Sequence, residues 1–137
     1  MTVGTMLVPY VALDLPAEAA SIGEARRRVS AFAAEHGGEL DVLGRIRIAI
    51  SEAVTNAVVH GNAGARRGVI SVMADFEEGD LEVVVTDDGR GLGARVMPGA
   101  GLGLGLVEAS ADRLRVRDRA PHGVEVWMRF ALVPRVL

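Results

Sequence analysis

Residues 50–62 read ISEAVTNAVVHGN, an apolar segment in which Glu52, Asn56 and His60 recur every four residues. In a helix, each of these side chains turns only about 40° from the one before, so all three project from one side. Asparagine costs up to roughly 0.7 kcal/mol against alanine in a helix interior, so Asn56 calls for a compensating role. A solvated helix face is the ordinary explanation for an isolated Glu-x-x-x-Asn pair. A stacked carboxylate and carboxamide also suit a proton acceptor and a ligand for hydrated Mg²⁺.

The elements on either side of this stripe follow from periodicity. Apolar residues at helical spacing predict a helix over 40–59, with glycines ending it. Before it, residues 6–15 predict a strand, and the helical pattern of residues 16–35 opens on a proline. After it, residues 69–76 and 81–86 are rich in β-branched side chains and predict two antiparallel strands joined by a hairpin turn.

The rest of the chain completes one domain. Residues 92–101 contain glycines and a proline without periodicity and predict a mobile loop. A helix is expected over 104–112, followed by strands over 114–117 and 124–132. The order β-α-α-β-β-α-β-β predicts an α/β (α+β) two-layer sandwich. We expect a mixed, mainly antiparallel five-stranded sheet with three helices on one face, and a single domain over residues 1–137.

Composition excludes several classes of function. The chain has no cysteine, which excludes a disulfide framework, a thiolate metal site and a cysteine nucleophile. All fifteen basic residues are arginine, so a P-loop lysine is excluded. A net charge of -3 gives no reason to expect nucleic acid. No apolar run approaches the roughly 20 residues that span a bilayer, and no signal peptide is evident, so we expect a soluble, cytoplasmic protein.

A second polar group follows the strand over 81–86. Asp87 stands where its carboxylate can accept a hydrogen bond in a crevice beside the sheet, and Gly89 and Gly91 let the backbone approach a flat ligand. An ordinary acidic turn is one alternative. A dinucleotide fingerprint is another, but it requires a helix directly afterwards, and residues 95–99 make a poor one.

A glycine-rich segment precedes the last expected helix. Gly101, Gly103 and Gly105 stand at alternate positions there, and a helix N-terminus offers free N–H groups to anions. Repeated glycine usually marks a flexible linker. The interleaved leucines indicate instead a segment that packs, and they are Leu102, Leu104 and Leu106.

In this order and at these separations, the three motifs resemble the N, G1 and G2 boxes of the GHKL (Bergerat-fold) ATPases, a group that includes gyrase, heat-shock chaperones, histidine kinases and mismatch-repair proteins. The resemblance covers nearly the whole chain, from about Tyr10 to Phe130. The Ser-Glu-Ala-Val-Thr-Asn-Ala form of the first box and the stand-alone length resemble the serine kinase anti-sigma factors.

The resemblance implies a role for each motif. Asn56 would coordinate Mg²⁺ that bridges the phosphates of ATP, and Glu52 would be the general base for the attacking serine hydroxyl. Asp87 would accept the adenine amino proton, with Gly89 and Gly91 shaping the pocket. The phosphates would be held by the third box under a lid of residues 92–100, through Gly101, Leu102, Gly103, Leu104, Gly105 and Leu106.

Two positions depart from this pattern or leave it open. Members of the family often carry a threonine just after a glycine in the last strand, where it helps to bind adenine. Here Gly123 is followed by Val124, which implies a weaker or water-mediated adenine contact. His60 either belongs to the ATP site or caps the end of its helix.

The function implied by the resemblance is an ATP-dependent anti-sigma factor. It would bind a sigma factor, phosphorylate a serine on an anti-anti-sigma partner and form a homodimer, with the first strand and helix as the candidate contact. One alternative is a nucleotide-dependent protein-binding module without kinase activity. Another is an orphan histidine-kinase-like domain, which is disfavoured because the chain has no room for a phosphoacceptor helix hairpin.

Overall fold

The computed structural model describes residues 7–61, 68–89 and 104–133. In these ranges, five strands form one sheet in the order β1-β2-β3-β5-β4, and every pair of neighbours is antiparallel. The strands are β1 (Tyr10–Pro16), β2 (Val69–Glu77), β3 (Asp80–Asp87), β4 (Arg113–Asp118) and β5 (Val124–Ala131). The expected five strands are therefore present, and the pairing is antiparallel throughout rather than mixed.

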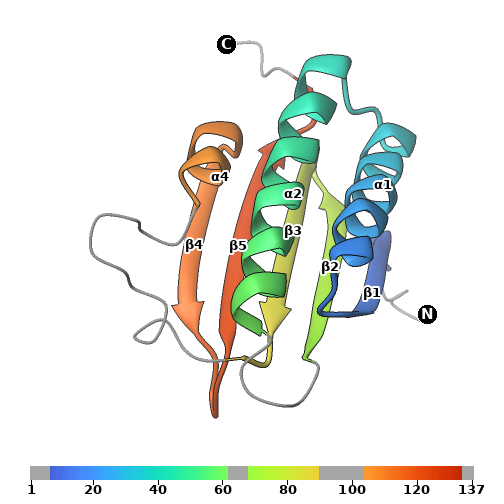
Figure 1. The fold of residues 1–137 in the computed structure, drawn as a ribbon. Helices are drawn as coiled ribbons and strands as arrows, with labels where there is room; N and C mark the ends of the chain where they lie inside the picture. Colours follow the sequence, from blue (N-terminus) through green and yellow to red (C-terminus); the bar gives the residue numbers. More distant parts are fainter. Residues whose placement is uncertain (1–6, 62–67, 90–103, 134–137) are drawn as a thin grey trace, which may run out of the picture.

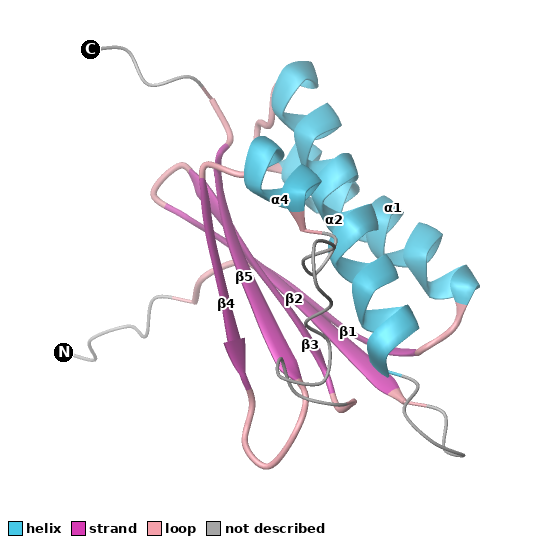
Figure 2. Cartoon of the chain, turned by 60° about the vertical axis from the view of Figure 1, so that its left-hand side comes forward, coloured by secondary structure: helices cyan, strands magenta, loops and turns pink. Residues whose placement is uncertain are grey.

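In the described ranges, three helices lie on the sheet. Figures 1 and 2 show that they cover the same face of it. They are α1 (Ala19–Glu35), α2 (Leu40–Gly61) and α4 (Gly105–Ser110). The long α2 lies across the middle of the layer, with α1 on one side and α4 on the other (Figure 1). This arrangement confirms the predicted two-layer sandwich with three helices on one face.

The core lies between the two layers. Along β3, every second residue is buried, beginning at Leu81 and ending at Asp87. The inward face of α2 supplies apolar side chains such as Ile46, Ile50 and Val54, all fully buried. Because β3 is the central strand, its inward row lies beneath the helices, and Asp87 is the one charged side chain that continues this apolar row.

All three helices differ in extent from the sequence-based expectation, and α2 ends at Gly61 rather than at residue 59. The first begins at Ala19 rather than Pro16, because Pro16 still pairs with Val69 at the end of β1. The last ends at Ser110, where the carbonyl accepts a hydrogen bond from Arg45 of α2 at 3.0 Å. A cation at a helix C-terminus satisfies a carbonyl that the helix itself leaves open.

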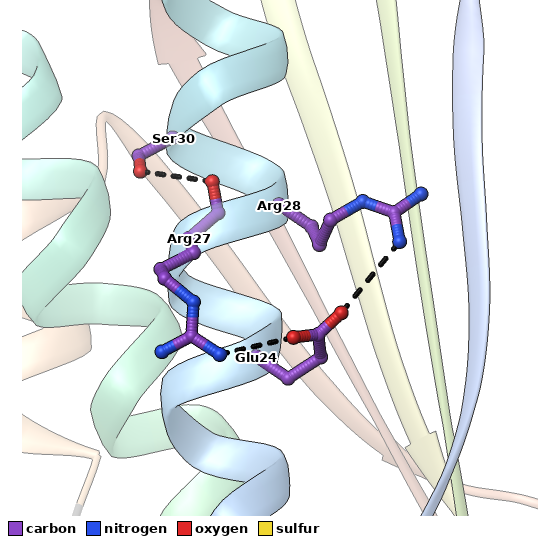
Figure 3. Close-up of polar contacts among 4 residues, drawn as sticks. All are labelled: Glu24, Arg27, Arg28 and Ser30. Atoms are coloured by element: carbon purple, nitrogen blue, oxygen red, sulfur yellow. Dashed lines mark hydrogen bonds and ion pairs between the residues drawn. The ribbon is translucent and has the colours of Figure 1, made fainter.

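The outer side of α1 is charged. Figure 3 shows Glu24 between Arg27, at 3.0 Å, and Arg28, at 3.6 Å. Such exposed pairs contribute only about 0.3–0.5 kcal/mol each, so they support the helix without fixing its place. That place is fixed by the buried face of α1 and by Arg26, whose Nη1 donates to the hydroxyl of Ser51 on α2 at 3.2 Å.

Candidate functional site

The polar stripe lies on the second half of α2, as predicted. Asn56 is only 7% exposed, so its carboxamide faces the interior side of the helix. Glu52 and His60 are half-buried, one turn before and one turn after it. The stripe is therefore not a fully solvated helix face. His60 lies within the last turn of α2, which continues to Gly61.

Asp87 occupies the end of β3, with 2% of its surface exposed. Its Oδ1 accepts a hydrogen bond from the main-chain N–H of Gly89 at 3.0 Å. This short-range bond orients the carboxylate within the turn that leaves the strand. The neighbouring Asp88 accepts the N–H of Val69 at 3.0 Å, which joins the same turn to the start of β2.

Glycines bring this turn against the end of α2. A Cβ atom at residue 89 would lie 2.4 Å from the main-chain oxygen of His60 and 2.6 Å from the Cα of Gly61. A Cβ at residue 61 would lie 3.5 Å from that of Asp87. The absence of a side chain at residue 89 therefore serves the packing of the strand end on the helix end, a role that the sequence does not reveal.

The turn between β4 and β5 also contacts the end of β3, at Asp87. Gly123 has a φ of 103°, and a Cβ there would lie 2.0 Å from the carbonyl oxygen of Asp87. Arg119 donates from Nη1 to that oxygen at 3.0 Å, and its own N–H donates to the carbonyl of Gly123 at 3.0 Å. Arg119 was missed by sequence reasoning because the contact spans thirty-two positions of chain.

Val124 is the residue that stands where the family often carries a threonine. Val124 pairs with Asp87 in the register of β3 and β5 and is buried. Its side chain offers no hydroxyl beside the aspartate. Position 124 is thus adjacent to the base-recognition candidate, where a threonine would have added a donor.

The third motif is described only in part. Leu104 is buried against the core and Leu106 is exposed, so only one of these two leucines packs. Gly105 opens α4, a helix of six residues. The remaining predicted positions lie outside the described residues, namely Gly91, Gly101, Leu102, Gly103 and the expected lid over 92–100.

The described part of the predicted site therefore gathers at one end of the molecule. The last turn of α2 contacts the Asp87–Gly89 turn, and Asn56 and Glu52 lie one and two turns further back along that helix. A hollow of about 480 Å³ lies elsewhere, near the start of α2, and is lined by both signs of charge, including Arg45 and Asp112. It contains no residue of the predicted site.

Comparison with known families decides the assignment. The family model described as the histidine kinase-like ATPase domain matches residues 15–130. The chain belongs to the histidine kinase-like ATPase family. The matched range includes the polar stripe of α2, Asp87 and the whole third motif. The recognition drawn from the three motifs is confirmed.

Within this family, the similar proteins are anti-sigma factors and serine kinases. The anti-sigma F factor of Clostridium acetobutylicum is 28% identical, over 93% of this chain and 99% of its own length. The serine-protein kinase RsbW of Bacillus velezensis is 33% identical, over 88% of this chain and 84% of its own.

A solved structure of the family agrees. The structure of the RsbU and RsbW domains of Rv1364c from Mycobacterium tuberculosis superposes with a TM-score of 0.74 at 27% identity. The match covers 93% of this chain and 34% of that longer one. The catalytic domain of the histidine kinase ThkA, at 16% identity and a TM-score of 0.56, shares the fold.

In the described ranges, no helix has both the length and the apolar character needed to cross a bilayer. The same residues hold no group of three or more histidine, aspartate or glutamate side chains placed to bind a metal ion.

Proposed function

We propose that this protein is an ATP-dependent serine kinase that acts as an anti-sigma factor. It binds a sigma factor and transfers the γ-phosphate of ATP to a serine of an anti-anti-sigma partner. The family match and the names of its relatives support this activity. The observation that carries it is the contact between the end of α2 and the Asp87–Gly89 turn, which places the polar stripe and the buried aspartate at one end of the fold.

Adenine recognition is assigned to Asp87. A buried carboxylate whose orientation is fixed by a main-chain N–H is suited to accept the exocyclic amino group of adenine. Arg119 holds the main-chain carbonyl of the same residue and is a positioning residue for it. The main chain of His60 lies against Gly89 where the strand end meets α2, and His60, Gly89 and Gly91 are assigned to the adenine pocket on the family resemblance.

Phosphate recognition is assigned to Asn56 and to the third motif. The carboxamide oxygen of Asn56 is a hard donor of the kind that Mg²⁺ accepts. Mg²⁺ is usually held by one or two protein groups together with substrate phosphates, so a single carboxamide suits this ion. When bound, the ion neutralises charge on the phosphates. The main-chain N–H groups of residues 101–106 would hold the phosphates.

Glu52 is assigned as the general base. It lies one turn before Asn56 on the same side of α2 and is half-buried, so it can face a serine hydroxyl presented to the γ-phosphate. Its carboxylate takes the hydroxyl proton as the oxygen attacks phosphorus and the bond to the β-phosphate oxygen breaks. A binding module without phosphotransfer would have no need of a base at this place, which favours the kinase over that alternative.

The test is a phosphotransfer assay. The purified chain is incubated with Mg²⁺, γ-labelled ATP and a serine-bearing anti-anti-sigma protein from the same genome, and phosphoserine is mapped by mass spectrometry. We expect label on one serine of the partner and none on a partner with that serine changed to alanine. ATP binding without transfer to any such partner would contradict the kinase and leave the binding module.

A further inference from the structure

Helix α4 begins at the third motif and lies beside the first half of α2 (Figure 1). Gly105 opens it, and its six residues extend about 9 Å to Ser110. A helix this short is not stable by itself, so tertiary contacts decide where it lies. Two of these contacts are apolar, since Leu104 and Val107 are buried in the core. The place of the third motif in the fold therefore depends on how α4 is anchored.

The C-terminal end of α4 is anchored by an arginine of α2. Nη1 of Arg45 donates to the main-chain carbonyl of Ser110 at 3.0 Å. The same guanidinium group lies near two carboxylates, with Asp112 3.8 Å from Nη1 and Asp41 3.7 Å from Nε. The side chain of Asp41 is 89% exposed, so its pair with Arg45 contributes little. The charge-assisted hydrogen bond to the end of α4 is the strongest of the three contacts.

Asp112 connects this anchor to the sheet. Its Oδ2 accepts the N–H of Ala131 on β5 at 2.7 Å, and its own N–H donates to the carbonyl of Arg129 at 2.9 Å. The chain just after α4 is thus fixed to β5, while Arg45 fixes the end of α4 itself to α2. Ser110 is buried, and a hydrogen bond at a site shielded from water is stronger than one in solvent.

The two helices that Arg45 joins carry the two parts of the proposed phosphate site. Asn56, the proposed Mg²⁺ ligand, lies on α2 about three turns after Arg45. Residues 104–106 stand at the start of α4. Phosphate binding requires the metal ligand and the main-chain N–H groups at a fixed separation. A contact that holds α4 on α2 therefore governs this separation from the far end of α4.

We propose that Arg45 is a positioning residue for the phosphates of ATP. It holds α4 against α2, so that the start of α4 stays at the distance from Asn56 that the phosphates and Mg²⁺ require. The inference rests on the proposed function, because it takes residues 101–106 to be the phosphate-binding segment. Adenine recognition is independent of this contact, since Asp87 is oriented by its own turn at the end of β3.

Arg45→Met tests this role, because methionine keeps an apolar stem but cannot donate a hydrogen bond. ATP binding is measured by calorimetry, and adenosine binding by competition with ATP. ATP should bind at least about fivefold more weakly to the variant, since a charge-assisted hydrogen bond is lost, whereas the affinity for adenosine should stay within about twofold. Arg45→Lys keeps a cationic donor without the guanidinium group, and its affinity for ATP should lie between those of the wild type and Arg45→Met.

Two control variants change neighbouring charges on α2. Asp41→Asn removes the exposed partner of Arg45, and Arg47→Met changes an exposed arginine two residues further along the helix. Both should leave the ratio of ATP affinity to adenosine affinity unchanged.

Amide hydrogen exchange follows the anchoring of α4 directly. The N–H groups of Glu108 and Ala111 are hydrogen-bonded within this helix, to the carbonyls of Leu104 and Val107. They should exchange faster in Arg45→Met than in the wild type, because the helix end is no longer held. Exchange at the wild-type rate would overturn the proposal.

The affinities can also overturn it. Equal losses for ATP and adenosine would show a general structural role for Arg45, and undiminished ATP binding by Arg45→Met would show no role at all. If circular dichroism shows that Arg45→Met does not fold, Arg45→Lys decides: a loss confined to ATP supports the proposal, and any other result overturns it. Absence of ATP binding by the wild type would overturn the proposed function as well, so the two failures are distinguishable.

Discussion

The main-chain N–H of Gly89 donates to Oδ1 of Asp87 at 3.0 Å, while residue 89 itself lies against the last turn of α2. One short turn thus orients the carboxylate and fixes the distance between strand end and helix end. This contact holds the polar stripe of α2 and Asp87 at one end of the molecule, so the turn joins the proposed adenine site to the proposed phosphate site.

The first prediction concerns adenine recognition. Asp87→Asn keeps an oxygen that can accept the N–H of Gly89, so the fold should be retained. The amide loses the negative charge that strengthens a hydrogen bond from the adenine amino group, and ATP and ADP should bind at least about tenfold more weakly. Competition with GTP measures selectivity. An equal loss for all triphosphates would argue against a contact between Asp87 and adenine.

A second prediction concerns the packing of residue 89. Gly89→Ala places a methyl group 2.4 Å from the carbonyl oxygen of His60, so the turn must shift. We expect a loss of about 1–3 kcal/mol in the free energy of unfolding, as for other overpacked sites, together with weaker ATP binding. Chemical denaturation gives the first quantity and calorimetry the second.

The matched control for this variant is Gly44→Ala. Its Cβ on α2 would meet no atom within 4 Å, and alanine is favoured over glycine in a helix by about 1 kcal/mol. The control should therefore be more stable than the wild type. If Gly89→Ala behaved in the same way, the close approach of the turn to α2 would be wrong.

A third prediction separates binding from chemistry. Glu52→Gln preserves shape and polarity but cannot take a proton, so ATP affinity should stay within about twofold while phosphotransfer falls by roughly 10²–10⁴. Labelled transfer to the serine partner measures the rate. Val59→Ala, an exposed position on the same helix, is the control and should change neither quantity. Transfer at the wild-type rate in the Glu52 variant would remove its role as base.

A fourth prediction uses pH. Burial, followed by the neighbouring Glu82 and Glu77 carboxylates, raises the pKa of Asp75 above its usual value. The folded state therefore holds the Asp75 proton more tightly than the unfolded chain, and stability falls as pH rises from the ordinary carboxyl range through the raised pKa. Asp75→Asn should be more stable than the wild type by a few tenths of a kcal/mol at neutral pH and no more stable in acid.

This comparison is made on single chains, so that association does not contribute to the measured stability. Denaturation curves are recorded at several pH values, at a protein concentration where sedimentation shows single chains. Glu35→Gln, which changes one exposed carboxylate at the end of α1, is the control. If Asp75→Asn were more stable than the wild type by the same amount at every pH, the negative charge of Asp75 would not be the cause of the difference.

Most of the fold was predictable because it rests on local patterns. The helical spacing of α2 and the alternation along β3 each depend on nearest neighbours in the sequence. The early start predicted for α1 was wrong because pairing of Pro16 with Val69 extends β1, and that pairing joins segments far apart in the chain. Tertiary contacts override local signals in such cases.

The places of the candidate site residues in the fold were predictable to the same degree. Asn56 and Asp87 are conspicuous in the sequence because each interrupts an apolar periodicity. The contacts that bring them together are not local, since Gly89 packs on a helix end and Arg119 reaches Asp87 from another turn. Nothing in the sequence around Gly89 or Arg119 indicates which residues they contact. Their roles could be identified only from the arrangement of the strands and α2 in the structure.

The central claim is tested most directly by calorimetric titration of ATP and ADP, with and without Mg²⁺, into the wild type and Asn56→Ala. We predict saturable, Mg²⁺-dependent binding of ATP by the wild type, and about 10- to 100-fold weaker binding by the variant, the range usual for lost metal-site contacts. Undiminished affinity in Asn56→Ala, or no binding of either nucleotide by the wild type, would contradict the account.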